Sequence, residues 1–195
     1  MLVNHNQANS PPTRPPTFPV PAVTDAQMQA VLRQRERLQE IADLGLTGAE
    51  ADRILQEVCT QAANALDLPI GLVTVVLDEA QHFAAQHGLD GWMEEANGTP
   101  VEWSFCRFSV ATKDAFVVEN AEHHALVQDN PLVTMDGLRC YAGIPLISSR
   151  GFALGAFCVA GKEPRDFSEN DLMTLRGFAA TAIARIEARR VHANE

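Results

Sequence analysis

The sequence predicts an α/β (α+β) fold in which antiparallel hairpins build a sheet and helices flank it. Two observations predict the sheet. The run 70–77 is rich in β-branched residues, and two apolar runs at 138–147 and 152–160 are joined by a Gly-containing turn at 148–151. A third observation predicts the helices, because segments near both ends of the chain carry apolar residues at helical spacing.

The first helix is predicted to begin at Thr24, since Gln27 lies three residues on and the two can form a capping box. It is expected to end near Gly45, with a stripe through Met28, Val31, Leu32, Leu38, Ile41 and Ala42. A second capping-box pattern at 47–50 predicts another helix, with Ile54, Leu55, Val58, Ala62 and Leu66 on one face. Cys59 falls beside that face and is interpreted as a core residue.

Strands are predicted at 70–77 and 81–88, joined by a turn. His82 and His87 are five residues apart, so the alternation of a strand predicts that they point to opposite faces as edge or surface residues. Residues 89–101 are expected to be a loop, in which Trp92 is either a lid over a pocket or a plug at the edge of the core.

The middle of the chain predicts a short helix or turn over 103–112, a short strand at 115–118 and a long loop with a helical turn at 120–131. The hairpin at 138–160 follows. Ser168 and Asp171 predict the start of the last helix. Its apolar stripe is continuous: Leu172, Leu175, Phe178, Ala179, Ala182, Ile183 and Ile186.

The composition indicates one domain with a tail, since 195 residues suffice for a sizeable core and the hydrophobic content of 46% is ordinary. Residues 1–23 hold six prolines and many amides, which predicts a disordered, dispensable arm; the alternative is a ligand for an aromatic groove at 15–19. A single domain is expected over 24–195.

The net charge of −10 gives no electrostatic footprint for nucleic acid or an anionic membrane. We therefore expect no nucleic-acid partner and no membrane partner. The chain also has no run of 18 apolar residues, so no spanning helix is expected, and its N-terminus lacks the pattern of a signal peptide.

The four cysteines are Cys59, Cys106, Cys140 and Cys158, and none forms a C-x-x-C pair. This spacing excludes a zinc knuckle and a thioredoxin-like motif, and no metal site is expected. Their apolar surroundings are typical of reduced thiols, which predicts a cytoplasmic protein.

Three motifs carry a family resemblance: Val117-Val-Glu-Asn-Ala121, Tyr141-Ala-Gly-Ile-Pro-Leu146 and Ala153-Leu-Gly-Ala-Phe-Cys158. Over roughly residues 38–190 the chain resembles the GAF domains of bacterial sensory proteins. The resemblance implies a central, largely antiparallel sheet of five or six strands with helices on both faces. It also implies a pocket beside the short helix and the 120–131 loop, and first and last helices that pack together on the other face.

The function implied by the resemblance is non-catalytic sensing, in which a small ligand or redox cue acts in the pocket and the terminal helices signal to a partner. Position alone assigns the pocket residues: Trp103, Phe105, Cys106, Phe108, Asn120, His123, Tyr141 and Phe157. One alternative is an interaction module without a ligand. The identity of any ligand or cofactor stays open.

A second alternative is an enzyme that reduces free methionine sulfoxide with cysteine thiols, as one GAF family does. Here Phe105 and Arg107 flank Cys106 in place of glycines, and residues 89–102 contain no companion cysteine. A covalent tetrapyrrole is disfavoured because no cysteine is followed by histidine. Haem would need an axial ligand such as His123 or His124 in the pocket, and a solvated loop explains both. We therefore expect no catalytic residues.

The apolar stripes of the terminal helices predict a homodimer. One sheet face can bury only part of two or three such helices, and soluble monomers avoid large apolar patches. The opposing interpretation is that arginine stems cover the stripes: Arg33, Arg37, Arg185 and Arg189.

Overall fold

The computed structural model describes residues 18–46 and 52–192. Within these residues a six-stranded antiparallel sheet has the strand order β3-β2-β1-β6-β5-β4, which confirms the predicted largely antiparallel sheet. The strands are β1 (Ile70–Val76), β2 (Ala80–His87), β3 (Gly98–Pro100), β4 (Phe116–Val118), β5 (Cys140–Ile147) and β6 (Ala153–Gly161).

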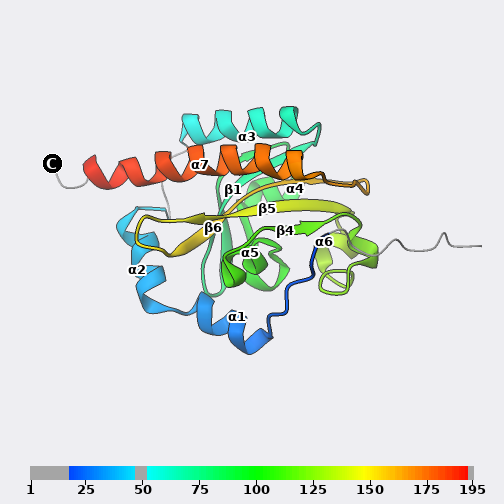
Figure 1. Cartoon of the computed structure of the whole chain (residues 1–195), viewed down its shortest axis with the longest axis horizontal. Coiled ribbons are helices and arrows are strands. Elements are labelled where there is room, and N and C mark those ends of the chain that lie inside the picture. Colours follow the sequence, from blue (N-terminus) through cyan, green and yellow to red (C-terminus); the bar gives the residue numbers. More distant parts are fainter. Residues whose placement is uncertain (1–17, 47–51, 193–195) are drawn as a thin grey trace, which may run out of the picture.

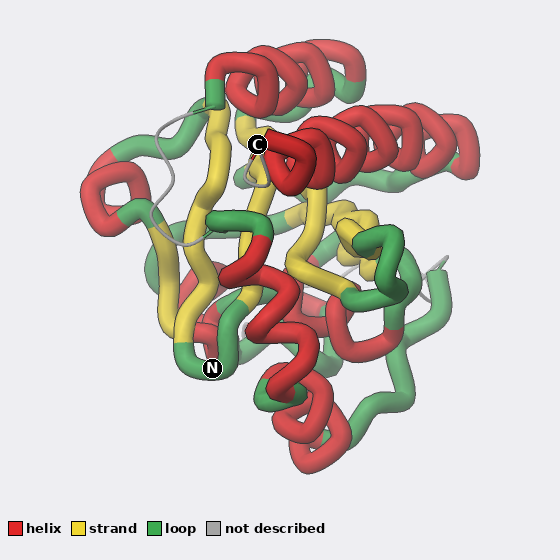
Figure 2. Tube along the Cα trace, turned by 90° about the vertical axis from the view of Figure 1, so that its left-hand side faces the viewer, coloured by secondary structure: helices red, strands yellow, loops and turns green. Residues whose placement is uncertain are grey.

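Helices cover both faces of the sheet, as predicted. The face under α3 (Arg53–Ala65) and α7 (Glu169–His192) is called the helix-pair face, and the opposite face, under α1 (Asp25–Leu32) and α5 (Cys106–Thr112), is called the cavity face (Figures 1 and 2). The shorter elements are α2 (Arg35–Asp43), α4 (Gly91–Ala96), α6 (Pro131–Thr134), η1 (Val101–Trp103) and η2 (Ala121–His123). Each face has its own apolar core, so the strands bury side chains in both directions.

The first helix begins at Thr24 with the predicted capping box, but the single helix predicted to run to Gly45 is wrong. It is interrupted at Arg33 and Gln34, and the cause is the buried side chain of Arg37, which is 1% exposed. Its guanidinium donates to the Val31 and Leu32 carbonyls at the end of α1. It also donates to carbonyls at the ends of β1 and β6, so the break is fixed to the sheet.

The expectation that the first and last helices pack together is wrong for α1, whereas Ile41 of α2 belongs to the same buried core as Ile186 of α7. α1 lies against α5 on the cavity face, and α3 takes the place beside α7 (Figure 1). The capping residues predicted at 47–50 lie outside the described residues. In the structure α3 starts at Arg53, where Asp52 is the N-cap and its carboxylate also binds Arg185 and Arg189 of α7.

The apolar stripe of α7 is buried inside the chain. Leu175, Ala182 and Ile186 are at most 1% exposed, and Ile41 of α2 is equally covered. The apolar stripes from which a dimer was predicted are therefore buried in the core of the same chain. What α7 leaves exposed is a different face: Met173, Arg176, Gly177, Ala180, Thr181 and Ala184.

A β-bulge changes the direction of side chains along β2. The pairing with β1 shifts between Val73 and Thr74, which leaves Ala84 as the extra residue. His82 pairs with Val75 and His87 with Gly71, so the two histidines share the helix-pair face rather than opposite faces as predicted. Beyond β2, the segment predicted as a loop contains α4 and β3.

Two residues of the predicted N-terminal arm pack on the domain. Phe18 packs against the core of the helix-pair face and Val23 against the core of the cavity face, so residues 18–23 belong with the domain. The remainder of the predicted arm, residues 1–17, lies outside the described residues. None of the helices described is long and apolar enough to cross a membrane.

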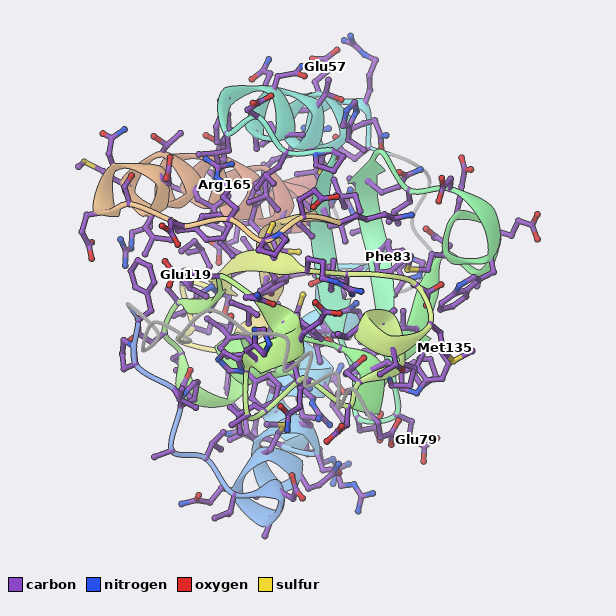
Figure 3. All side chains as sticks on the ribbon, turned by 90° about the vertical axis from the view of Figure 1, so that its right-hand side faces the viewer. Glu57, Glu79, Phe83, Glu119, Met135 and Arg165 are labelled. Atoms are coloured by element: carbon purple, nitrogen blue, oxygen red, sulfur yellow. The ribbon has the colours of Figure 1, made fainter. Side chains whose placement is uncertain are left out.

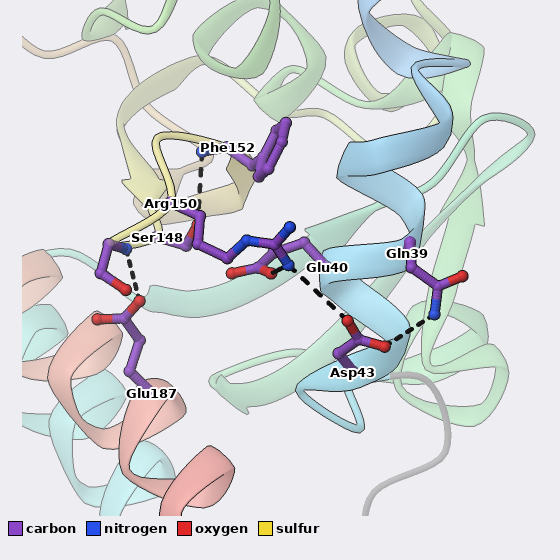
Figure 4. A network of polar contacts seen from close by, with 8 residues as sticks. Gln39, Glu40, Asp43, Ser148, Arg150, Phe152 and Glu187 are labelled. Atoms are coloured by element: carbon purple, nitrogen blue, oxygen red, sulfur yellow. Dashed lines mark hydrogen bonds and ion pairs between the residues drawn. The ribbon is translucent and has the colours of Figure 1, made fainter.

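The turn between β5 and β6 connects helices that are distant in sequence (Figure 4). Arg150 in this turn pairs with the fully buried Glu40 of α2 at 2.7 Å. The backbone N–H of Ser149 donates to Glu187 of α7. The turn thus holds α2 and the C-terminal part of α7 to the same end of the hairpin.

Candidate functional site

A cavity of about 60 Å³ lies on the cavity face of the sheet, beneath α4, α5 and α6. It exists because β6 presents small side chains on this face, Ala156, Cys158 and Ala160, while its larger Phe157 and Val159 point the other way. Figure 3 labels Phe83 of the cavity wall on β2, and Met135 at the surface beyond it. The lining residues are Ile70, Leu72, Gln81, Phe83, Leu89, Met93, Thr99, Phe105, Cys106, Leu132, Asp136, Leu138, Tyr141, Cys158, Ala160 and Lys162.

The cavity wall is apolar except for a few polar groups. Thr99 of β3 is 5% exposed, and its hydroxyl has no hydrogen-bond partner among the described residues. Gln81, opposite Thr99 in the β2–β3 ladder, accepts a hydrogen bond from the Ser104 hydroxyl. A buried hydroxyl without a partner is costly, so the Thr99 side chain marks a place where a small polar molecule would be stabilised.

Two cysteines meet at the floor of the cavity. Cys106 starts α5 and Cys158 lies on β6; their Sγ atoms are 3.8 Å apart, and the residues are 2% and 1% exposed. The Tyr141 hydroxyl of β5 donates to Cys106 Sγ at 3.2 Å. Residues 52 positions apart in the chain therefore form a dithiol with a phenol beside it.

The environment shifts the pKa values of Cys106 and Cys158 in opposite directions. Burial acts to raise the pKa of Cys106, but hydrogen bonds from its neighbours hold that pKa below its ordinary value: Cys158, Thr74, Tyr141 and Ser104. Thr74 and Ser104 give their single hydroxyl protons to other acceptors, so the direct donor to Cys106 is the Tyr141 hydroxyl. The hydrogen bond with Cys106, together with burial, raises the pKa of Cys158 well above its ordinary value. The Tyr141 hydroxyl therefore lies where it would stabilise a thiolate on Cys106.

The other two cysteines are different. Cys59 and Cys140 belong to the core of the helix-pair face and do not line the cavity. Burial raises the pKa of Cys59 to about 12 and that of Cys140 to about 11. Both are inert packing residues, and the prediction that Cys59 is a core residue is confirmed.

The mouth of the cavity is bounded by α4 and by the segment after α6. Trp92 of α4 is 39% exposed, and its indole N–H donates to Asp136 at 2.7 Å. Its ring meets Trp103 edge-on at 5.8 Å. Met93 lines the cavity from the same helix, and Asp136 lines it from the other side. Trp92 itself is not among the lining residues, so its role as a lid or a plug stays a prediction.

The structure brings together three of the eight pocket residues assigned by position: Phe105, Cys106 and Tyr141 line the cavity. Phe108 is buried nearby but packs against Phe116 at 4.7 Å. Trp103 lies at the rim, where its carbonyl accepts from Asn130.

The remaining assigned residues lie elsewhere. Phe157 is a correction, because the alternation of β6 turns its ring to the helix-pair face, where it stacks on Phe178 at 6.2 Å. Asn120 is the N-cap of η2 and accepts from the Glu122 N–H. His123 is exposed, whereas His124 is buried against Phe116. Burial lowers the pKa of His124.

Sequence reasoning missed Cys158, Thr99 and Gln81. A signal for Cys158 was present, since its neighbours at alternate positions of β6 are alanines, which indicates a face with free space. Thr99 and Gln81 carried no such signal, because β3 was not expected and the bulge in β2 sets which residues face the cavity. Within the described chain, no three metal-ligating side chains come together.

Comparison with known proteins identifies the family to which this architecture is similar. The GAF domain family matches residues 50–186. A Pseudomonas aeruginosa protein named cyclic di-GMP phosphodiesterase PA2567 is 33% identical over 159 residues, which cover 80% of this chain and 26% of that protein. The chain thus spans about a quarter of that relative's length.

Solved structures share the fold at low identity. The free methionine-R-sulfoxide reductase of Neisseria meningitidis has a TM-score of 0.58 and 19% identity, covering 88% of this chain and 96% of that one. The GAF domain of an Acinetobacter phosphoenolpyruvate-protein phosphotransferase has a TM-score of 0.53 and 20% identity, with coverages of 88% and 97%. GAF3 of Slr1393 from Synechocystis has a TM-score of 0.57 and 12% identity, with coverages of 72% and 96%. With the family matched along most of the chain and the fold shared, this chain belongs to the GAF domain family.

Proposed function

We propose that the chain is a sensory GAF domain that binds a small molecule in the cavity beneath α4. The observation that carries this proposal is the unpartnered Thr99 hydroxyl, which faces an otherwise apolar cavity beside Gln81. Among the described residues, the unpartnered buried side-chain atoms are those of Gln29, Thr99 and Arg107, and of these three only Thr99 lines the cavity. Sites for drug-sized ligands have volumes of about 300–1,000 Å³. At about 60 Å³ this cavity takes a ligand of only a few heavy atoms unless α4 moves.

The experiment titrates a library of small fragments into the whole chain and follows backbone amide shifts by NMR. Bound fragments should shift Gln81, Thr99 and Cys106. Thr99→Val, which keeps the shape and removes the hydroxyl, should weaken fragments that bond to it by about fivefold, the loss expected for one hydrogen bond. The matched control is Thr60→Val in α3, which removes a hydroxyl on the opposite face of the sheet from the cavity. If no fragment at millimolar concentration shifts the cavity residues, or if Thr99→Val binds as well as the wild type, ligand sensing is refuted.

We also propose that the domain passes its state through α7 to a second copy or to a partner. Support comes from the exposed face of α7, where Gly177, Ala180 and Ala184 follow helical spacing and Met173 is 65% exposed. Small residues allow the close approach of a second helix. Ala180→Arg should then turn a sedimenting dimer into a folded monomer. Leu38→Glu is unsuited to this test, because Leu38 packs against the domain's own core.

The relative PA2567 supports a regulatory role of the same kind. The chain matches only 26% of that protein, whose name describes a phosphodiesterase, so the shared part fits a control domain within a signalling enzyme. A cytoplasmic location, in keeping with four free cysteines, belongs to this proposal.

A further inference from the structure

We propose that Cys106 and Cys158 form a peroxide-reactive dithiol that closes to a disulfide. The inference rests on the pairing of these thiols in the cavity, and it does not require that a ligand binds. It starts from the 3.8 Å separation of the two Sγ atoms. A disulfide needs about 2 Å. The sulfurs must therefore approach by less than the diameter of one atom, and the cavity beside them leaves room for that movement.

The cavity selects the oxidant by size. At 2% and 1% exposure, the cysteines cannot be reached by a bulky disulfide such as oxidised glutathione, which must bring its own sulfur into line with the attacking thiolate. A volume of about 60 Å³ accepts a few water-sized molecules, and hydrogen peroxide has only two heavy atoms. The Thr99 hydroxyl and Gln81 offer polar contacts inside the same cavity. The chemical class is therefore a small hydroperoxide.

The two thiols take different roles. Cys106 is the nucleophile, because Tyr141 and Cys158 donate hydrogen bonds that stabilise its thiolate. The Cys106 thiol first releases its proton to solvent. The thiolate then attacks one peroxide oxygen, an S–O bond forms, the O–O bond breaks, and the departing hydroxide takes up a proton from solvent and leaves as water. Cys106 is then a sulfenic acid. Burial keeps the Tyr141 phenol protonated, so it remains a donor throughout.

Cys158 completes the reaction. Its sulfur attacks the Cys106 sulfur, an S–S bond forms, the S–O bond breaks, and the hydroxyl leaves as water with the Cys158 proton. In total, two thiols and one hydrogen peroxide give one disulfide and two waters. The pair loses two electrons and the peroxide gains them. Because the partner thiol is already in contact, the sulfenic acid is resolved inside the protein before further oxidation.

The test uses the reduced full chain, treated with hydrogen peroxide, quenched with acid, and alkylated after denaturation. Two of the four thiols should become unavailable to the alkylating agent, and peptide mapping should join Cys106 to Cys158. Cys158→Ser should stop at a sulfenic acid on Cys106 that dimedone traps. The matched control Cys140→Ala removes a buried thiol outside the cavity and should oxidise like the wild type.

Two further measurements test the mechanism without relying on loss of a cysteine. Tyr141→Phe keeps the ring and should slow oxidation by about two- to tenfold through a smaller thiolate fraction. An aromatic disulfide reagent should react with none of the native thiols during the time in which peroxide acts. The proposal is overturned if all four thiols survive excess peroxide, if Cys59 or Cys140 oxidises as fast as Cys106, or if Tyr141→Phe reacts at the wild-type rate. It is also overturned if the bulky reagent reaches the pair. Fragment binding in the cavity would be unaffected by such failures, so the two proposals stand or fall separately.

Discussion

Replacing Asp52 tests how α3 and α7 are held together. Asp52 Oδ1 accepts from the N–H groups of Ile54 and Leu55 at 3.0 and 3.2 Å, as the N-cap of α3. Asp52 Oδ2 accepts from Arg185 and Arg189 of α7 at 2.9 and 3.0 Å. The carboxylate is 5% exposed, so one side chain closes the start of one helix and the end of another.

These contacts set the loss in the free energy of unfolding that is expected when Asp52 is removed. Loss of an N-cap costs about 1 kcal/mol. Hydrogen bonds to charged groups contribute about 1.5–3 kcal/mol. The arginines are 39% and 22% exposed and regain water when Asp52 is removed, which favours the lower end of that range. Asp52→Ala should therefore cost about 2–3 kcal/mol in the free energy of unfolding. For a chain of 195 residues, this lowers the melting temperature by about 5–10 °C.

The assay is urea unfolding of matched variants followed by circular dichroism. Asp52→Asn keeps the cap and loses the charge, so it should fall between the wild type and Asp52→Ala. Arg53→Ala is the control, because its pair with Glu57 is on the surface and contributes about 0.3–0.5 kcal/mol. If Asp52→Ala costs no more than Arg53→Ala, the reasoning about the clamp is refuted.

Acid provides an independent check. Burial acts to raise the pKa of Asp52, but hydrogen bonds from Arg189, the Leu55 N–H and Arg185 bring it below its ordinary value. A pKa that is lower in the folded state gives stability that is present above the unfolded value of about 3.9. That stability is lost as the pH falls through the folded value. The gap between the wild type and Asp52→Ala should therefore be full at neutral pH and shrink below about pH 4.

Three further predictions concern stability and use urea unfolding. Thr99→Val should stabilise the unliganded chain by about 1 kcal/mol, because an unpartnered buried hydroxyl is replaced by a methyl group of the same shape; an unchanged midpoint would mean that the hydroxyl is already satisfied. Phe157→Ala should cost about 3–5 kcal/mol, because the ring is fully buried against Phe178; a cost below 1 kcal/mol would contradict this packing. Gly177→Ala, made in the Ala180→Arg background that keeps the chain monomeric, should gain about 0.5–1 kcal/mol, since a Cβ there meets open space within the chain; a loss in that background would contradict this.

Much of the architecture could be predicted because it depends on local patterns. The capping box at Thr24, the apolar run of β1 and the stripe of α7 are periodic or positional signals, and each gave the right element. The break between α1 and α2 could not be predicted in this way. It depends on Arg37 reaching carbonyls of β1 and β6, and β6 lies 116 residues further along the chain.

The site was harder to predict than the fold for a related reason. Phe157 was assigned to the pocket because it lies in a family motif, but its neighbour Cys158 is the residue that faces the cavity. Position in a motif does not report which side of a strand a residue occupies. The position of Thr99 in the cavity depends on β3, an edge strand of three residues. Such a strand is too short to show the alternation of apolar and polar residues by which a strand is recognised in a sequence.

Because Phe157 and Cys158 are adjacent in β6, their side chains point to opposite faces of the sheet and enter two different environments. The thiol meets Cys106 on one side, and the ring stacks on α7 on the other. Successive residues of a strand advance by only about 3.3 Å. If the Cys158 sulfur moves toward α5 by rotation of the strand and not by rotation of its own side chain, the Phe157 ring must move relative to Phe178 as well.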